Sequence, residues 1–338
     1  MTTSQFKNIF VTGGAGYCGS RLVPQLLERG HKVTVYDIMY FGYDFLPKSN
    51  PGLTIIEGDI RDAAKLAKVV PGHDAFVSLA CISNDASFEL DDHLSTSINY
   101  DAFEPMVLAA KKSGVTRFIY ASSSSVYGVS DQPDVTEDHP LVPLTLYNKY
   151  KGMCEPILAR HTDASFVGVT FRPATVCGYA PRQRLDLSVN ILTNHAINNN
   201  KITVFGGSQL RPNLHIQDYC DAVKCFLDAS SEKIANGIFN VGYQNLSIMD
   251  IAVLVKKVVE MEFPGRPPID IVTTSSDDIR SYHINSDKVK RELGFTPKYT
   301  IEDAVRELCR AFRDNLFPNS MTDDAYYNVR RLKQLKAA

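Results

Sequence analysis

The chain has 338 residues, of which 44% are hydrophobic and 22% charged, with a formal net charge of −2 at pH 7. This balance is typical of a globular protein, and the absence of a basic face or charged block argues against nucleic acid as the main partner. No apolar run approaches the roughly 20 residues of a membrane-spanning helix, so we expect no membrane partner and a cytoplasmic location. The seven cysteines and eight histidines show no disulfide or ligand spacing, so no metal site is expected.

The first predicted strand, residues 8–12, runs into a glycine-rich turn that opens an amphipathic helix. Gly13 permits the tight turn, Gly16 lets the backbone approach a pyrophosphate, and Gly19 lets the helix pack on the strand. The free N–H groups and the dipole at the helix N-terminus favour the negative charge of the pyrophosphate. This turn therefore predicts a dinucleotide site.

The second predicted strand, residues 32–36, ends in Asp37. A carboxylate at this place can accept hydrogen bonds from a ribose diol but repels a 2′-phosphate, so the sequence favours NAD over NADP. Asp59 follows the third strand and has two readings of equal weight. It either lies close to the adenine or caps the helix that begins near Asp62.

Strands and helices continue to alternate through the first half of the chain. We expect further strands at 53–57, 75–80, 116–121 and 165–171, and helices at about 94–114 and 145–163. Such alternation predicts an α/β fold with a doubly wound parallel sheet of the Rossmann type. Ligands of such sheets bind at the carboxyl ends of the strands, where the motifs described above converge.

Tyr147 and Lys151 lie four residues apart, so they share one face of the second long helix. An ammonium beside a phenol favours the phenolate and lowers its pKa, which suits a tyrosine that removes a proton from a hydroxyl. Taken alone, the pair fits a half-exposed tyrosine with a solvated lysine better than a catalytic pair, because both residues are common on helix surfaces. The dinucleotide motifs that precede it favour the catalytic reading.

Taken together, the motifs resemble those of the extended short-chain dehydrogenases/reductases, and among them the nucleotide-sugar epimerases and dehydratases of the UDP-glucose 4-epimerase type. The resemblance covers nearly the whole chain. It is carried by Thr12–Gly19, Asp37, Asp59-Ile60, Asn99, Ser122–Gly128 and Tyr147 with Lys151. It implies NAD contacts from Gly13, Gly16, Tyr17, Cys18, Gly19, Asp37, Asp59, Ile60, Leu79, Ala80, Asn99 and Lys151.

The resemblance also implies a shared first step on a nucleotide-diphosphate sugar. Tyr147 removes a proton, usually from the 4-hydroxyl, while NAD takes the hydride. Lys151 lowers the pKa of Tyr147 and binds the nicotinamide ribose, and Ser123 hydrogen-bonds the same oxygen, with Ser122 and Ser124 left as alternatives.

The second half resembles a smaller, interlocked α/β lobe that binds the substrate. We expect residues 1–178 to form the NAD-binding Rossmann domain, rejoined by about 213–242, and residues 179–212 and 243–338 to form this lobe. Expected helices lie at 186–198, 218–229, 247–261, 285–294 and 302–315, and strands at 202–205 and 237–241. Substrate contacts are expected from Ser124, Ser125, Thr175, Asn190, Arg211 and Arg280.

Several residues of this half have competing readings. The guanidinium fork of Arg211 suits a diphosphate. The resemblance implies that Arg280 is a second diphosphate contact, although Arg280 also fits a solvated surface residue. We expect His215 to have a structural role. The tail 317–338 departs from the family pattern, so it either packs on a neighbouring subunit or frays.

The residues after Ser123 decide among the family's reactions. By resemblance, 4,6-dehydratases carry Asp-Glu, decarboxylases a glutamate and epimerase/reductases a cysteine in slots that here hold Ser124 and Ser125. With no extra acid or base there, we expect a 4-epimerase that returns the hydride to the other face of the sugar. The alternatives are a 4-keto reductase, a dehydratase whose acid comes from elsewhere, such as Asp85 or Cys177, and a non-catalytic NAD(P) sensor. The resemblance also implies a homodimer paired through helices 94–114 and 145–163.

Overall fold

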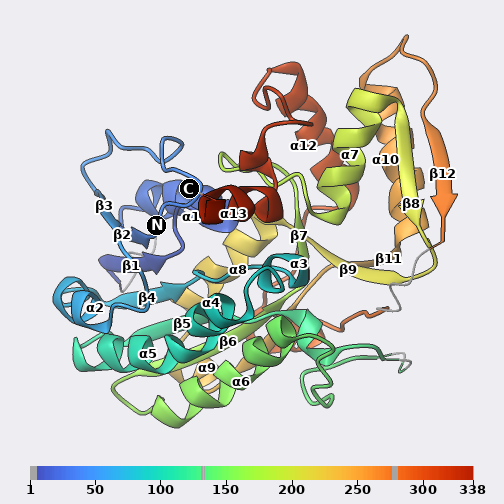
Figure 1. Ribbon diagram of the computed structural model, residues 1–338. Helices are drawn as coiled ribbons and strands as arrows, with labels where there is room; N and C mark the ends of the chain where they lie inside the picture. The colour runs from blue at the N-terminus through green and yellow to red at the C-terminus, as the bar shows by residue number, and fades with distance from the viewer. Residues whose placement is uncertain (1–5, 131, 133, 276–280, 338) are drawn as a thin grey trace.

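The computed structural model describes residues 6–130, 132, 134–275 and 281–337. The main body of the molecule is a parallel sheet of seven strands (Figure 1). The strand order is β10-β6-β5-β4-β1-β2-β3. The strands are β1 (Asn8–Thr12), β2 (Lys32–Asp37), β3 (Leu53–Glu57), β4 (Ala75–Ser78), β5 (Arg117–Ala121), β6 (Val167–Pro173) and β10 (Ile238–Val241). Six of them come from residues 8–173 and β10 from much later in the chain, which confirms the doubly wound parallel sheet.

Helices cover both faces of this sheet because alternate side chains of each strand point to opposite faces. Ile9 and Val11 belong to the core beneath α1 (Tyr17–Glu28) and α8 (Ile216–Asp228), whereas Phe10 belongs to the core on the other face. That second face is covered by α2 (Ala63–Val69), α5 (Phe103–Lys112) and α6 (Leu146–His161) (Figure 1).

A second lobe has a hydrophobic core of its own and lies at the upper right of Figure 1. It contains α7 (Ser188–Asn199), β8 (Lys201–Phe205), α10 (Ile248–Glu262), β12 (Asp270–Thr274) and α12 (Ile301–Arg313). Thr300 caps α12 in a reciprocal capping box with Asp303. A separate three-stranded sheet is formed by β7 (Thr175–Cys177), β9 (Leu210–His215) and β11 (Gln244–Ser247). The sequence analysis did not predict β7, β9, β11 or β12.

The shorter helices complete the chain. They are α3 (Asp85–Phe88), α4 (Asp92–Thr96), η1 (Ser97–Asp101), η2 (Ser124–Tyr127), α9 (Ser231–Ile234), α11 (Asp287–Leu293), η3 (Asp324–Tyr326) and α13 (Asn328–Ala337). The helix expected at 94–114 is thus α4, a π-helical turn and α5 in succession. Among the described residues no helix is long and apolar enough to cross a membrane, and no group of side chains is arranged to hold a metal ion.

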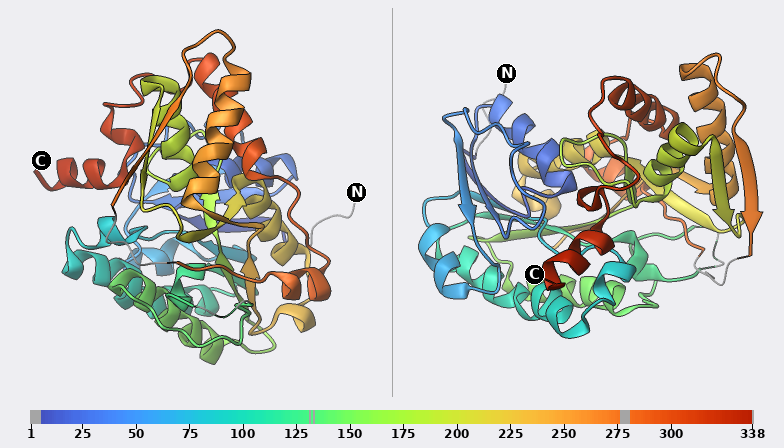
Figure 2. Two further views of the ribbon diagram at one scale, coloured as in Figure 1. Left: turned by 90° about the vertical axis from the view of Figure 1, so that its right-hand side faces the viewer. Right: turned by 45° about the horizontal axis from the view of Figure 1, so that its top comes forward.

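The tail folds back onto its own chain, so the expectation that it frays is wrong. Leu332 of α13 is buried in the core beneath the sheet's second face, and Arg331 donates to the carbonyl oxygen of Tyr40 at 2.8 Å. Figures 1 and 2 show α13 lying across the carboxyl edge of the sheet, beside α3.

Candidate active site

The carboxyl ends of the strands open into a cavity of about 350 Å³, which we call the sheet-edge cavity. Its lining includes most of the residues that the sequence placed at the dinucleotide and the reacting hydroxyl. They are Gly13, Gly16, Tyr17, Cys18, Gly19, Asp37, Asp59, Ile60, Leu79, Ala80, Ser123, Ser124, Ser125, Tyr147, Lys151 and Thr175. Side chains from seven separate segments thus meet at one edge of the sheet.

The glycine turn forms a close-packed cradle at the start of α1. Gly13 has φ of 72°, and a Cβ there would lie 2.6 Å from the backbone nitrogen of Ala80. A Cβ on Gly19 would lie 2.5 Å from the carbonyl oxygen of Gly13. Gly16 is the N-cap of α1 and makes no side-chain cap, so N–H groups of the first turn face the cavity without an acidic residue to compete for them. This cradle fits the pyrophosphate of a dinucleotide.

Asp37 lines the sheet-edge cavity from the end of β2. Its carboxylate accepts hydrogen bonds from the backbone nitrogens of Ala15 at 3.0 Å and Met39 at 2.9 Å. Burial raises the pKa of Asp37, and these two hydrogen bonds act in the opposite direction. The carboxylate is therefore held rigidly and keeps lone pairs for a ribose diol.

Asp59 lines the same end of the cavity but does not cap α2. That role belongs to Asp62, which accepts from the backbone nitrogen of Lys65 at 2.8 Å. Asp59 instead holds the guanidinium of Arg61, with its two oxygens 2.9 and 3.0 Å from Nε. The capping reading of Asp59 is wrong, and its place beside the cavity agrees with the other reading.

Tyr147 and Lys151 both project into the sheet-edge cavity from the first turns of α6. Lys151 is buried, and its ammonium donates to the carbonyl oxygen of Ala121, the last residue of β5, at 2.7 Å. Burial raises the pKa of the Tyr147 phenol well above 10.0; Cys81 and Asp85 raise it further, and Arg184 acts to lower it. In the protein alone, burial therefore outweighs the acidifying effect that the sequence analysis expected from Lys151.

The serines after β5 have different partners. Ser122 donates to the carboxylate of Glu155 at 2.6 Å. The Ser123 and Ser125 hydroxyl oxygens lie 2.7 Å apart, and Ser125 also donates to the side-chain oxygen of Asn148 on α6. Ser123 thus has a polar neighbour that fixes its orientation while it faces the cavity.

A buried ion pair holds α6 against the sheet behind these serines. Arg172 of β6 binds both oxygens of Glu155, with Nε–Oε1 at 2.9 Å and Nη2–Oε2 at 2.6 Å. Arg172 also donates to the Tyr127 hydroxyl at 2.6 Å. Because Glu155 lies one helical turn after Lys151, this pair fixes the rotation and height of α6, and with them the positions of Tyr147 and Lys151.

A second cavity of about 410 Å³ adjoins the first on the side of the smaller lobe, and we call it the lobe cavity. Asn84, Asp85, Ser125, Thr175, Leu187 and Tyr282 line both cavities. Arg211 lines the lobe cavity, and its guanidinium lies 5.5 Å from the ring centroid of Tyr282. Ser124 lies in the sheet-edge cavity. Arg280 lies outside the described residues.

Three candidate residues lie outside both cavity linings. Asn190 is buried and bonded to the Gly178 nitrogen at 3.0 Å, the Tyr17 hydroxyl at 3.1 Å and the Arg184 carbonyl at 2.8 Å. Asn99 accepts from the nitrogen of Ile82 and donates to its carbonyl, both at 2.8 Å, so it fixes the loop after β4. Cys177 is buried, and burial raises the pKa of its thiol.

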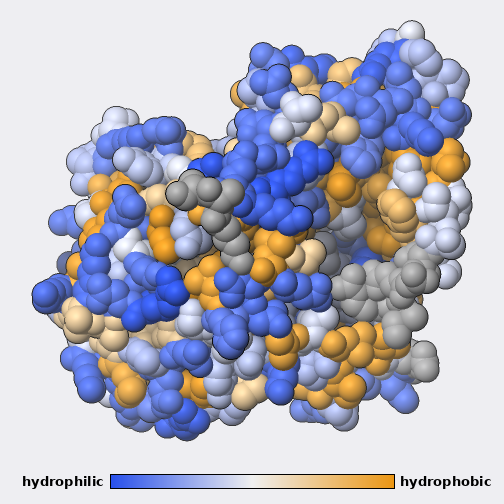
Figure 3. Space-filling view, in the orientation of Figure 1, coloured by the Kyte–Doolittle hydropathy of each residue, from blue (hydrophilic) through white to orange (hydrophobic). Residues whose placement is uncertain are grey.

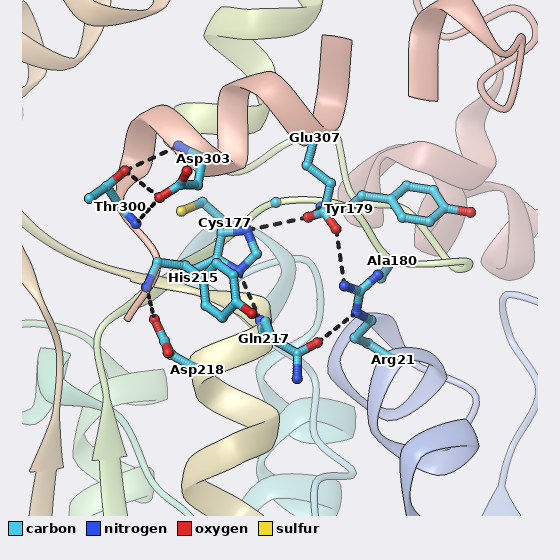
Figure 4. Close-up of polar contacts among 12 residues, drawn as sticks. Arg21, Cys177, Tyr179, Ala180, His215, Gln217, Asp218, Thr300, Asp303 and Glu307 are labelled. Atoms are coloured by element: carbon cyan, nitrogen blue, oxygen red, sulfur yellow. Dashed lines mark hydrogen bonds and ion pairs between the residues drawn. The ribbon is translucent and has the colours of Figure 1, made fainter. Parts of the chain in front are cut away.

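His215 belongs to a polar cluster that joins the two lobes away from both cavities (Figure 4). Its Nδ1 accepts from the backbone nitrogen of Gln217 at 3.0 Å, and its Nε2 lies 3.3 Å from Glu307 of α12. Glu307 also accepts from Arg21 of α1 at 3.0 Å. The hydrogen-bonding role expected of His215 is confirmed.

The sequence analysis missed several residues of the sheet-edge cavity. Arg182, Arg184, Ser83 and Asn328 all line it, and they come from a stretch without helical or strand periodicity, from the loop after β4 and from the tail. The signal that could have indicated the two arginines is Pro181-Arg-Gln-Arg184, a pair of cations a few residues after the segment Thr175–Gly178.

The fold and this site define a dinucleotide-binding protein of the Rossmann class with a tyrosine and a lysine beside the cofactor site. A family model described as the NAD dependent epimerase/dehydratase family matches residues 9–242, and the chain belongs to this family. Its cofactor is NAD, as the sequence predicted.

Both epimerases and dehydratases resemble the chain along almost its whole length. UDP-glucose 4-epimerase of Lactobacillus helveticus is 28% identical and covers 88% of this chain and 94% of its own. A dTDP-glucose 4,6-dehydratase of Actinoplanes is 25% identical over 91% of this chain and 98% of its own. Among solved structures, UDP-N-acetylglucosamine 4-epimerase of Methanobrevibacter ruminantium, in complex with UDP-N-acetylmuramic acid, is 25% identical with a TM-score of 0.81, covering 91% and 99% of the two chains.

Proposed function

We propose that the protein is an NAD-dependent nucleotide-sugar 4-epimerase. The observation that carries this proposal is the convergence of Ser123, Tyr147 and Lys151 on the cavity that the glycine turn opens. Ser124 and Ser125 stand in the two places where, by the family resemblance, a dehydratase carries an acid pair. Ser125 is bonded to Ser123 and Asn148, so this position supports the site without supplying a strong acid or base.

In the proposed reaction Tyr147 acts as the general base toward the hydroxyl on C4 of the sugar. Ser123 hydrogen-bonds the same oxygen, and Lys151, anchored on Ala121, holds the nicotinamide ribose and adds positive charge. NAD, when bound, supplies the positive ring charge that favours the phenolate and the carbon that takes the hydride and returns it. Tyr147 then returns the proton to the oxygen of the inverted sugar.

We assign the dinucleotide to the residues of the sheet-edge cavity predicted to hold it. Gly13, Gly16 and Gly19 leave room for the pyrophosphate, and Asp37 accepts from the adenosine ribose. Asn99 acts on the dinucleotide site indirectly. Its side chain is hydrogen-bonded to the backbone of the loop that carries Leu79 and Ala80 toward the cavity.

The nucleotide diphosphate of the substrate is assigned to the lobe cavity. Arg211 offers a guanidinium fork there, which suits a diphosphate. The sugar then spans the boundary between the cavities, where Ser125 and Thr175 belong to both linings. A ketosugar held only through its diphosphate can rotate at this boundary, as inversion at C4 requires.

A dehydratase is the second candidate, and Asp85 is the observation that favours it. This carboxylate lines both cavities, and Thr145, the N-cap of α6, donates to it at 2.5 Å. Asp85 therefore lies close to the helix turn that carries Tyr147. In a dehydratase it would serve as the acid or base that the serines at 124 and 125 do not provide.

Asp85→Asn separates the two reactions. An epimerase keeps turnover within about tenfold, because Asp85 then contributes only to the local charge. A dehydratase loses on the order of a hundredfold or more, since proton transfer at the eliminated positions is lost. The matched variant is Asp92→Asn, which changes a carboxylate in α4 that lies outside both cavity linings.

We also propose that two copies associate through α5 and α6. Apolar side chains gather at the lower right of Figure 3, over the segment that leads into α6. Exposed residues of this segment and of α6 include Leu141, Val142, Leu144, Leu146 and Met153. Light scattering after size exclusion should give twice the chain mass, and Met153→Glu should reduce it, whereas Val253→Glu on exposed α10 should not. A wild-type mass of one chain would contradict the dimer.

The activity is tested by incubating purified protein with UDP-, GDP-, CDP- and dTDP-sugars without added reductant and reading the products by NMR. Inversion at C4 with unchanged mass is the expected result. Loss of water would establish the dehydratase, and turnover that requires both a ketosugar and NADH would establish a reductase. NAD retained without any turnover across the panel would favour the sensor.

A further inference from the structure

Two arginines of the segment between β7 and α7 lie against the start of α1. The backbone nitrogen of Arg182 donates to the hydroxyl of Ser20 at 3.1 Å, and the Tyr17 hydroxyl donates to the carbonyl oxygen of Gly178 at 2.6 Å. These bonds tie residues 178–182 to the first turn of the helix that the glycine turn opens. Arg182 and Arg184 both line the sheet-edge cavity, and neither lines the lobe cavity.

Both side chains are buried without all of their hydrogen bonds being made. Arg182 is 4% exposed and Arg184 is 7% exposed. Nη2 of Arg182 donates to Asn328 at 2.6 Å, but its Nε has no partner among the described residues. Arg184 donates to Asp186 at 2.8 Å and Ser83 at 3.1 Å, but its Nη2 likewise lacks a partner in that part of the chain. Leaving buried charged donors unpaired is costly, so each marks a place for an acceptor.

Asp186 is a carboxylate that acts on both arginines. Asp186 forms an ion pair with Arg184, and its second oxygen accepts from the backbone nitrogen of Asn328 at 2.9 Å. Burial lowers the pKa of Arg182, Arg184 lowers it further, and Asp186 and Asp37 oppose this only in part. The N-terminus of α1, which faces the same cavity, adds its own positive dipole end. An anion beside the two guanidinium groups would accept from their unpartnered donors, whereas an apolar neutral ligand would not.

We propose that Arg182 and Arg184 bind the pyrophosphate bridge of the dinucleotide together with the glycine turn, and that Asn328 of the C-terminal helix α13 holds Arg182 in place for this contact. The proposal rests on the proposed NAD-dependent function and extends it to residues outside the glycine turn. Nucleotide sugars also carry a pyrophosphate, but both arginines line the cavity of the glycine turn, whereas Arg211 lines the neighbouring one.

The same contacts give α13 a role in retaining the cofactor. Asn328 bridges Arg182 to Ser83, donating to the Ser83 hydroxyl oxygen at 2.9 Å, and Leu332 of the same helix lines the cavity. Asn328 is therefore a positioning residue. Release of a dinucleotide held by the arginines requires α13 to loosen, so this helix should slow dissociation.

The proposal is tested by titrating the full-length chain, freed of bound nucleotide, with ADP-ribose, ADP, adenosine and UDP. Arg182→Met and Arg184→Met each remove a charge while keeping most of the side-chain volume. We expect affinity for ADP-ribose and ADP to fall roughly tenfold to hundredfold in each variant, as for a lost hydrogen bond to a charged group, and adenosine binding to change by less than about twofold. Asn328→Ala should speed the release of bound NAD without changing adenosine binding.

Arg29→Met is the matched control, because Arg29 lies at the end of α1 in an exposed ion pair with Asp228. Circular dichroism and melting temperature verify that each variant is folded, and Arg184→Lys, which keeps the charge, should recover part of the lost affinity. Unchanged ADP-ribose binding in both folded arginine variants would overturn the proposal. Loss of UDP binding with intact ADP-ribose binding would also overturn it, by assigning the pair to the substrate. Because only binding is read, the outcome does not depend on which sugar is turned over.

Discussion

The ammonium nitrogen of Lys151 lies 2.7 Å from the carbonyl oxygen of Ala121, where β5 ends and the serine segment begins. This hydrogen bond ties α6 to the edge of the sheet through a neutral acceptor. An ammonium has three donors, so two remain for the cofactor ribose and for Tyr147. The position of Lys151 is thus fixed by the fold before any ligand binds.

Tyr147→Phe removes the proposed general base and keeps the ring. We expect the turnover number to fall by about a hundredfold to ten-thousandfold, the usual range for a positioned proton-transfer group. Bound NAD per chain, measured after heat release, should stay at the wild-type level, because the phenol is not needed to hold the dinucleotide. Turnover retained by this variant would disprove the assignment of the base.

Ser123→Ala should mainly reduce turnover, whereas Ser122→Ala should mainly reduce stability. Loss of the Ser123 hydroxyl removes a hydrogen bond to the reacting oxygen, so turnover should fall by roughly tenfold to a hundredfold with little change in stability. Ser122 donates to the buried carboxylate of Glu155, so its loss should cost about 1–3 kcal/mol of unfolding free energy. Denaturant melts and initial rates on the two variants give the comparison; the reverse pattern would assign the catalytic hydroxyl to Ser122.

Asp37→Asn tests the choice of cofactor. Removing the negative charge abolishes the repulsion of a 2′-phosphate and weakens the acceptor for the ribose diol. We expect NAD affinity to fall by roughly tenfold and NADP affinity to rise. The measurement is calorimetric titration with both dinucleotides, with Asp44→Asn in an exposed ion pair as the control. An unchanged ratio of the two affinities would contradict this role of Asp37.

Alkaline pH should destabilise the fold through its buried tyrosines. Burial raises the pKa of Tyr17, Tyr120 and Tyr219 well above the ordinary value of 10.0. Below pH 10 these phenols are protonated in both the folded and the unfolded chain, so their contribution to folding stability is fully present. Above it the unfolded chain loses protons that the native state keeps, and stability falls by about 1.4 kcal/mol per pH unit for each tyrosine.

Melting temperatures measured from pH 8 to pH 11 check this expectation. The curve should begin to fall near pH 9, because burial also raises the pKa of thiols such as Cys177 and Cys220 above the ordinary value of 9.0, and it should fall more steeply above pH 10. Replacing Tyr120, whose hydroxyl donates to the Lys151 carbonyl at 3.2 Å, by Phe should make the fall shallower. A stability that rises above pH 10 would contradict the account.

The alternation of strands and helices was enough to predict the sheet and its functional edge. Parallel strands bring their carboxyl ends together, so Gly13, Asp37 and Tyr147 could be placed at one site although they lie far apart in the sequence. Helix ends were predictable where caps are local, as at Thr300.

What could not be predicted depends on contacts between distant segments. In the sequence, Asn190 looks like a polar helix residue that faces a ligand. In the structure, its side-chain amide is hydrogen-bonded to Tyr17 and Gly178. Arg182 lies in a stretch without periodicity, and its burial depends on α13, which closes over it from the far end of the chain. The raised pKa of Tyr147 likewise follows from burial. Burial depends on all the segments around the cavity, so it cannot be predicted from the spacing of Tyr147 and Lys151.

The most direct test of the central claim uses a nucleotide sugar of the class accepted by the protein, carrying deuterium on C4. Product mass and NMR are read without added reductant. The account predicts that the label remains on C4, that the configuration there is inverted and that the mass is unchanged. A product that has lost water, or one inverted at C4 without the label, would contradict it.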